Sequence, residues 1–220
     1  MYVNQFKNRS MYKYIMDIET SPQKSLVETC EKNIKPKATL KDPDKIKADI
    51  ESKKQGLKKT MSVDPDYNEI LCIGIKTIGK DDAKLYKLEE MEEWFKDKHF
   101  INEIDENKLP VHGFEFITFN GKSFDIPTII KTGIKNNLDF PYTLLREMCK
   151  KWNAKQHIDL MEVLSFNSNA KSLDTLLQIY CGISKTPIDF ETATEKEIKE
   201  HCLEDLKNTE LLYNKFKNIF

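Results

Sequence analysis

Residues 14–20 read Tyr-Ile-Met-Asp-Ile-Glu-Thr and place two acids, Asp17 and Glu19, in an otherwise apolar run. Such a run is typical of a buried strand, and residues i and i+2 of a strand share one face. The two carboxylates therefore point the same way, and they repel each other unless a cation lies between them. Mg²⁺ and Mn²⁺, which prefer oxygen ligands, suit that role. Two solvated acids at a strand end are the alternative.

The composition, 39% hydrophobic and 32% charged over 220 residues, is typical of a globular protein. We expect one domain spanning residues 1–220, with an insertion at about 22–66. No stretch approaches the roughly 20 apolar residues of a membrane helix, and the chain start lacks a secretory signal. We therefore expect a cytoplasmic protein without a membrane partner. Five scattered cysteines without a C-x-x-C pair disfavour disulfides and a structural zinc site. The sequence carries no signal about oligomeric state.

Positive charge is concentrated in one segment of a chain whose formal net charge is −1. Residues 31–60 contain ten lysines and five acids. One interpretation is a solvated helical excursion, which is common for lysine-rich stretches. The other is a surface that tracks a phosphate backbone or covers a binding site.

The pattern along the chain predicts a mixed sheet flanked by helices, an α/β fold with a lysine-rich helical insertion after the first strand. Hydrophobic periodicity predicts strands at about 12–18, 69–76, 83–87 and 114–119. It predicts helices at about 42–59, 88–107, 126–136, 142–152, 172–180 and 194–217. The early strands look hairpin-linked rather than joined by crossovers.

A second acid site, at Asp125, follows the strand at 114–119 and a turn containing Gly121. It falls at the start of a helix with Pro127 in the first turn, where the helix dipole favours an anion. An ordinary N-cap aspartate is the alternative interpretation. Asn120, at the strand end beside a glycine, is suited to contact with a substrate.

A third candidate lies in the last predicted helix, where His201 and Asp205 are four residues apart and share one face. A histidine, with an unperturbed pKa of about 6.5, can accept a proton from a water molecule near neutral pH. A surface pair without functional consequence is the alternative.

These segments together resemble the DEDD superfamily of 3′-to-5′ exonucleases, which have a ribonuclease-H-like fold. The resemblance is strongest to the proofreading-domain branch related to family-B DNA polymerases, found in stand-alone form in phages and prophages. It spans about residues 12–217 and rests on three motifs in the expected order, at 16–20, 119–125 and 201–205. The resemblance implies that four acids form the catalytic centre: Asp17, Glu19, Asp125 and Asp205.

One residue departs from that branch, which has tyrosine four positions before the last acid, where this chain has His201. The sister branch uses histidine, but usually with one more intervening residue. Either His201 orients or deprotonates the attacking water, or activity is weakened; histidine chemistry favours the first.

The resemblance implies two-metal hydrolysis of phosphodiester bonds with two Mg²⁺ or Mn²⁺ ions about 3.5–4 Å apart. Asp17 would bridge both ions, Glu19 and Asp205 would complete one site, and Asp125 would hold the other ion through water. Asp159 is either a fifth acid near the site or an ordinary loop acid.

The expected partner is nucleic acid, with 3′ ends of single-stranded DNA as the leading substrate and RNA as the alternative. Phe124, Phe119 or Phe166 could stack on a base, although core packing is the alternative for each. Two other functions stay open from the sequence. One is a catalytically weakened nucleic-acid-binding or recombination-accessory protein, and the other is a structural protein with surface acids. We expect the protein to act in a bacterial or phage-infected cell.

Overall fold

The computed structural model describes residues 12–97, 114–151, 156–166 and 169–219. One mixed sheet has the strand order β3-β2-β1-β4-β5. Its strands are β1 (Tyr12–Pro22), β2 (Asn68–Thr77), β3 (Lys84–Tyr86), β4 (Phe114–Thr118) and β5 (His157–Asp159). The central strand β1 pairs antiparallel with β2 and parallel with β4, and β5 adds in parallel to β4. The mixed α/β sheet predicted from the sequence is confirmed.

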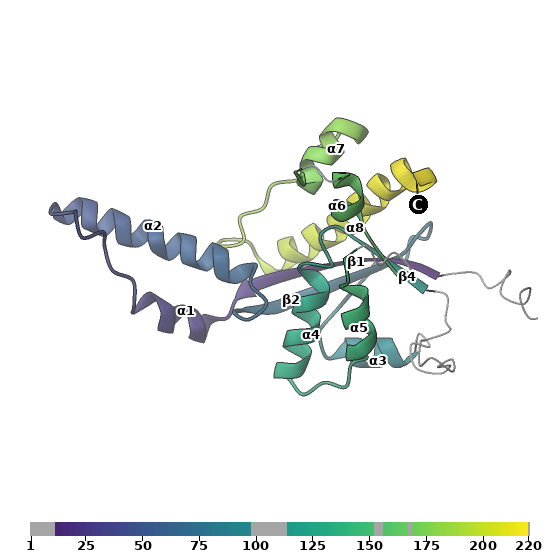
Figure 1. Ribbon diagram of the computed structural model, residues 1–220, viewed down its shortest axis with the longest axis horizontal. Coiled ribbons are helices and arrows are strands. Elements are labelled where there is room, and N and C mark those ends of the chain that lie inside the picture. The colour runs from purple at the N-terminus through teal and green to yellow at the C-terminus, as the bar shows by residue number, and fades with distance from the viewer. Residues whose placement is uncertain (1–11, 98–113, 152–155, 167–168, 220) are drawn as a thin grey trace, which may run out of the picture.

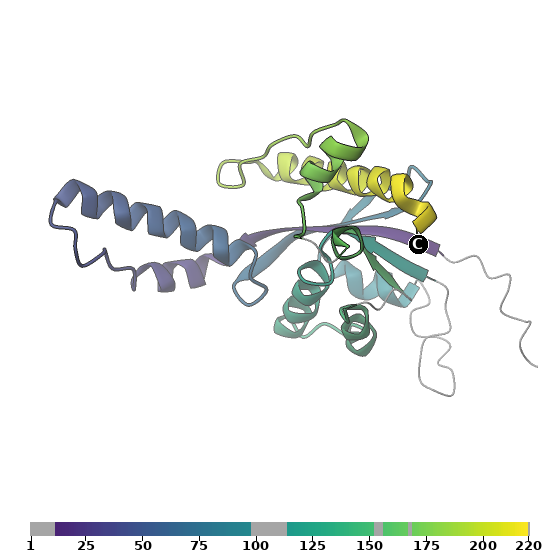
Figure 2. The same ribbon diagram turned by 45° about the horizontal axis from the view of Figure 1, so that its top comes forward.

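Helices cover both faces of this sheet (Figures 1 and 2). One face carries α3 (Glu90–Asp97), α4 (Asp125–Lys135) and α5 (Tyr142–Met148). The other face carries α7 (Leu173–Cys181) and α8 (Glu195–Phe216), which is followed by a short 3₁₀ turn, Lys217–Ile219. The chain therefore forms three layers, with the sheet in the middle.

The alternation of β1 explains why each layer has its own core. Met16 and Ile18 point into the cluster formed with α3, α4 and α5. Ile15 points into the opposite cluster, which contains Leu206 of α8. Because strand side chains alternate, Asp17 and Glu19 share the α8 side with Ile15. The register of β1 thus decides which helix layer the two acids meet.

Gly74 allows α8 to lie close to the sheet. It is the direct partner of Asp17 in the β1–β2 pairing. A Cβ atom at Gly74 would lie 2.7 Å from Cys202 Sγ and 3.0 Å from Leu206 Cδ1. Since such distances are shorter than normal contacts, a side chain at this position would push α8 away from β2. The glycine therefore positions the helix that carries His201 and Asp205.

The segment between β1 and β2 forms a helical arm that projects beyond the sheet (Figures 1 and 2). It contains α1 (Lys24–Glu31) and α2 (Pro43–Ser62), which lie against each other and are joined by the ion pair between Glu31 and Lys54. The α2 helix begins at its N-cap Asp42, whose carboxylate accepts from the backbone N–H of Asp44. Its other end is fixed to β1, where the Thr20 hydroxyl donates to the Ser62 carbonyl over 2.7 Å.

Several elements differ from the sequence predictions. The α1 helix, β5 and α6 (Leu160–Ser165) were not predicted, and α5 ends at Met148 rather than near Trp152. Short elements carry little periodicity, so tertiary packing decides them. The predicted helix at 88–107 is observed as α3, and its part after Asp97 lies outside the described residues. The predicted hairpin of β2 and β3 is confirmed. The strands β1 and β2 are also antiparallel neighbours, but the long helical arm joins them instead of a tight turn. Among the described helices none has the length and apolarity to cross a membrane.

Candidate active site

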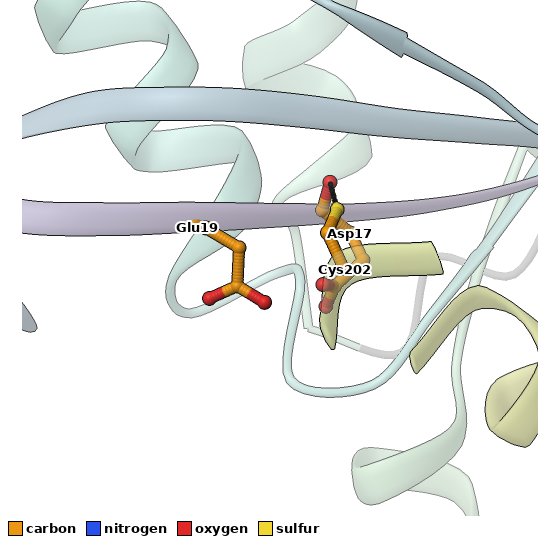
Figure 3. A group of neighbouring side chains, drawn as sticks. All are labelled: Asp17, Glu19 and Cys202. Atoms are coloured by element: carbon orange, nitrogen blue, oxygen red, sulfur yellow. Dashed lines mark hydrogen bonds between the residues drawn. The ribbon is translucent and has the colours of Figure 1, made fainter. Parts of the chain in front are cut away.

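The two acids of β1 lie side by side on the face that α8 covers. Figure 3 shows the carboxylates of Asp17 and Glu19 on the same side of the strand, next to Cys202 of α8. The Cys202 Sγ atom is 3.9 Å from the backbone oxygen of Asp17. A register shift between Glu19 and Thr20 marks a β-bulge directly after the second acid. Bulges of this kind re-aim side chains beside active sites.

The α8 helix brings His201 and Asp205 to these acids. The two residues lie one turn apart, with 3.8 Å between His201 Nε2 and Asp205 Oδ2. Glu19, His201 and Asp205 each offer a ligand atom within 4.8 Å of the other two. The first and third motifs, from opposite ends of the chain, therefore meet in space.

Asp125 joins the cluster as the first residue of α4, with only 3% of its surface exposed. Burial raises the pKa of Asp125 to about 8, against the opposing effect of hydrogen bonds from its own backbone N–H and that of Ile18. The bond to Ile18 ties the Asp125 carboxylate to the backbone of β1. The N-cap position belongs to Phe124, so Asp125 is not an ordinary N-cap.

The pKa values of both acids of β1 are also raised. Burial, together with the charges of Asp125 and Glu19, raises the pKa of Asp17 well above the usual range of an aspartate. Burial and the charge of Asp205 raise the pKa of Glu19 to about 8. Without a compensating cation, these groups hold protons near neutral pH. The negative charge of the cluster must therefore be neutralised, either by protons or by a bound cation.

Lys185 supplies one positive charge to the cluster, although sequence reasoning did not select this residue. Its ammonium forms an ion pair with Asp205 Oδ2. Two acids hold its loop: Asp174 accepts from the Lys185 N–H over 2.8 Å, and Glu204 accepts from the Thr186 N–H over 3.0 Å. No motif marks this lysine among many others; only the path of the loop between α7 and α8 brings it to the site.

The donor set fits a hard divalent cation. Within the described residues, Asp205 Oδ1 is buried without a hydrogen-bond partner. The ligand atoms of Asp17, Glu19 and Cys202 also lie within 4.8 Å of one another. A hydrogen bond with Cys72 and, to a smaller extent, burial raise the pKa of the Cys202 thiol well above its usual range. The sulfur therefore stays neutral. Carboxylate oxygens are thus the available ligands, as Mg²⁺ and Mn²⁺ require.

A comparison with protein families assigns the chain to one of them. Residues 66–219 match the family described as "predicted 3′-5′ exonuclease related to the exonuclease domain of PolB". The chain belongs to this exonuclease family. The matched region contains Asp125, His201 and Asp205, and it begins after both acids of β1. The three-dimensional arrangement connects those two acids to the matched part.

The fold of this family member is also similar to a solved polymerase. The family B DNA polymerase from the hyperthermophilic archaeon Pyrobaculum calidifontis matches with a TM-score of 0.55 and 12% sequence identity. The match covers 94% of this chain and 24% of the polymerase, so the chain corresponds to about a quarter of that protein. At this identity the similarity concerns the fold, which is ribonuclease-H-like. No curated protein matches the chain.

The turn before Asp125 presents the candidate substrate residues of this exonuclease fold. Asn120 adopts a left-handed conformation with φ of 70°. A Cβ atom at Gly121 would lie 2.3 Å from Thr118 Oγ1, so only glycine fits. Phe124 is partly buried against the core beneath α4. Asn120 also lines a cavity of about 490 Å³ beside the turn.

Asp159, left open by the sequence, holds this turn in place. It is 2% exposed and accepts from the backbone N–H groups of Asn120, Lys122 and Met161 over 2.9–3.0 Å. It is thus the N-cap of α6, and its charge also contributes to the raised pKa of Asp125. Asp159 therefore positions the second motif, and it belongs to an ordered strand end rather than a loop.

The other two aromatic candidates differ in exposure. Phe119 is partly buried and packs against the α7–α8 core. Phe166, in a left-handed conformation after α6, is 70% exposed. Core packing therefore accounts for Phe119, whereas Phe166 lies free on the surface.

Proposed function

We propose that this protein is a metal-dependent 3′-to-5′ exonuclease that hydrolyses phosphodiester bonds, with single-stranded DNA as its substrate. One observation carries the proposal: four carboxylates from three distant elements converge, and burial and mutual repulsion raise the pKa values of Asp17, Glu19 and Asp125. These acids are Asp17, Glu19, Asp125 and Asp205. Membership of the exonuclease family supports the same reaction.

The acids would hold two Mg²⁺ or Mn²⁺ ions. Asp17 lies within reach of the charges of Glu19, Asp125 and Asp205, so it is the residue suited to serve both ions. The unpartnered Oδ1 of Asp205 is an available ligand atom in the described site. Bound there, the ions would acidify a water molecule and stabilise the charge on the attacking and leaving oxygens.

We assign His201 the role of accepting the proton of the attacking water. Burial lowers the pKa of its imidazole below the usual value, so the ring is neutral near pH 7 and can act as a base. Phe190 packs edge-on against the ring, with 5.7 Å between the ring centroids. This contact, together with Asp205 one turn further along α8, fixes the orientation of the imidazole.

Lys185 holds the Asp205 carboxylate through their ion pair. Its ammonium offsets part of the repulsion that raises the pKa values of Asp17 and Glu19. We assign it a positioning role, because its contact in the structure is with a carboxylate of the site.

Asn120 and Phe124 are the proposed substrate contacts. Both belong to the turn that delivers Asp125, so a nucleotide bound to this turn is held next to the acids. A single strand exposes base faces for stacking, which a duplex does not. This favours single-stranded 3′ ends over paired ends.

The test is degradation of a 5′-labelled single strand of DNA in the presence of Mg²⁺ or Mn²⁺. We expect a ladder of products shortened from the 3′ end, which requires the metal and vanishes in Asp17→Asn. Asp81→Asn, at an exposed turn acid outside the site, is the matched control and should keep full activity. Parallel reactions with duplex DNA and RNA define the preferred substrate.

A second outcome would support a different function. His201, in place of the tyrosine of the related branch, is compatible with a catalytically weakened nucleic-acid-binding or recombination-accessory protein. Tight binding of the strand without shortening under either metal would favour that function. Absence of both binding and cleavage would overturn the proposal.

A further inference from the structure

The chain separates its charges between the arm and the rest of the molecule. Residues 31–60 contain ten lysines and five acids, whereas the remaining residues contain 25 basic and 31 acidic side chains. Part of this excess lies in residues 32–47, which we call the arm tip. It holds two acids, Asp42 and Asp44, and six lysines: Lys32, Lys35, Lys37, Lys41, Lys45 and Lys47. A basic surface on an otherwise acidic molecule is the electrostatic pattern of phosphate binding.

Among the residues that the structure describes, ion pairs engage lysines near the middle of the arm but only Lys37 of the tip. Asp49 pairs with Lys53 at 2.8 Å and with Lys37 at 3.9 Å. Glu31 pairs with Lys54 at 3.4 Å and with Lys58 at 3.9 Å. Within the described residues, the other tip lysines have no ion pair and are exposed: Lys32, Lys35, Lys41, Lys45 and Lys47. Their ammonium groups are therefore available to an external anion.

The arm spreads these lysines along its length: Lys35 lies beside Lys53 in the middle of α2, whereas Lys41 and Lys45 flank the far end of that helix. The arm leaves β1 three residues after Glu19 and continues past the end of the strand (Figures 1 and 2). The α2 helix has 20 residues, so its far end lies about 30 Å from its anchor at Thr20. At about 3.4 Å per phosphate of a stacked strand, this distance corresponds to about nine nucleotides.

We propose that the arm tip binds the phosphate backbone of the nucleic acid whose 3′ end lies at the acid cluster, within about nine nucleotides of that end. This inference rests on the proposed function, because it takes the acid cluster as the place of the 3′ end. The arm then determines how long a substrate must be for full affinity. The bound phosphates belong either to the single strand itself or to a duplex that precedes a short 3′ overhang.

The test compares binding of short and long substrates to a tip variant. Lys35, Lys41, Lys45 and Lys47 are changed together to glutamine in the Asp17→Asn background, so that the nucleic acid stays intact. The matched control changes four exposed lysines that lie away from the arm and form no ion pair within the described residues: Lys84, Lys207, Lys215 and Lys217. The probes are single strands of about five and about 30 nucleotides, and a hairpin with a short 3′ overhang.

We expect the tip variant to bind the long strand on the order of tenfold more weakly and the short strand unchanged. The slope of log Kd against log salt should fall by up to about 0.7 for each lost contact to a single strand. Loss confined to the hairpin would assign the phosphates to the duplex and also support the inference. The control variant should match its parent.

Two results overturn the inference and are distinguishable. Equal affinity of tip variant and parent for every probe refutes the role of the arm while leaving the exonuclease proposal intact. If the parent binds none of the probes and the active protein cleaves none, the proposed function fails, and the inference fails with it.

Discussion

The two carboxylate oxygens of Asp205 have different environments. Oδ2 contacts Lys185, and Oδ1 is buried without a hydrogen-bond partner in the described part of the chain. A buried anion of this kind is stable only if a cation stays close. In the metal-free protein Lys185 supplies that cation, and a bound metal would supply a stronger one.

Replacing Lys185 with methionine should therefore destabilise the metal-free protein by about 1–3 kcal/mol, because Asp205 loses its charged partner. Urea unfolding at pH 8 in a chelator measures this difference, with Lys84→Met, at an exposed site, as the control. Adding Mn²⁺ should reduce the difference. Equal stability of Lys185→Met and the parent in the chelator would contradict this account of the ion pair.

The neutral imidazole of His201 is the residue assigned to proton transfer. Replacing His201 with alanine should lower kcat by about 10²–10⁴-fold, the usual range for a general base. Binding of single-stranded DNA, measured with Ca²⁺ in place of the active metal, should change little. If kcat is unchanged, the proposed role in handling the attacking water is wrong.

The contact between α8 and β2 shows how one element positions chemistry on another. The helix carries His201 and Asp205, and its distance from the sheet is limited by Gly74. Leu206 and Cys202 fill the space that a side chain at Gly74 would need. Close packing leaves no slack at this contact, so an added atom must displace the helix.

Gly74→Ala should cost about 1–3 kcal/mol of stability and lower exonuclease activity, because overpacking moves α8 away from the β1 acids. Gly56→Ala is the matched control, since Gly56 lies inside α2 with no atom within 4 Å of a new Cβ. That change should stabilise the protein by about 0.5–1 kcal/mol through helix propensity. Chemical denaturation and the cleavage assay measure both. A stable, fully active Gly74→Ala variant would contradict the packing argument.

At the scale of the whole molecule, the acid cluster couples stability to pH and metal. Glu19 and Asp125 have pKa values of about 8 in the folded protein and near 4 when unfolded. Between these values the folded state binds more protons than the unfolded state. Stability is therefore highest below about pH 4 on account of these groups, and it is lost as pH rises to about 8.

The melting temperature of the metal-free protein should accordingly fall between pH 5 and pH 8 more steeply than that of Asp125→Asn, which lacks one of the raised groups. Thermal unfolding in a chelator across this range tests the difference. Mn²⁺ should raise the melting temperature most at pH 8, where the ligands are ionised and binding stabilises the folded state by mass action. Identical pH profiles for the two proteins would refute the raised pKa of Asp125.

The sequence by itself determined the elements with strong local signals. The apolar run at 14–20 fixed β1 and the common face of its acids, since strand geometry leaves no choice. The same holds for α2 and α8, whose N-caps and long periodic patterns are local features. These signals, with three motifs in order, sufficed to predict the fold class and the candidate acids.

Tertiary structure alone decided the rest, because these features depend on contacts between distant segments. Lys185 reaches Asp205 only through the path of its loop, and Asp159 receives its role from the turn it binds. The space above Gly74 exists only once α8 lies on β2. The raised pKa values arise only after folding gathers the acids and removes water around them, and no local pattern encodes burial at that scale.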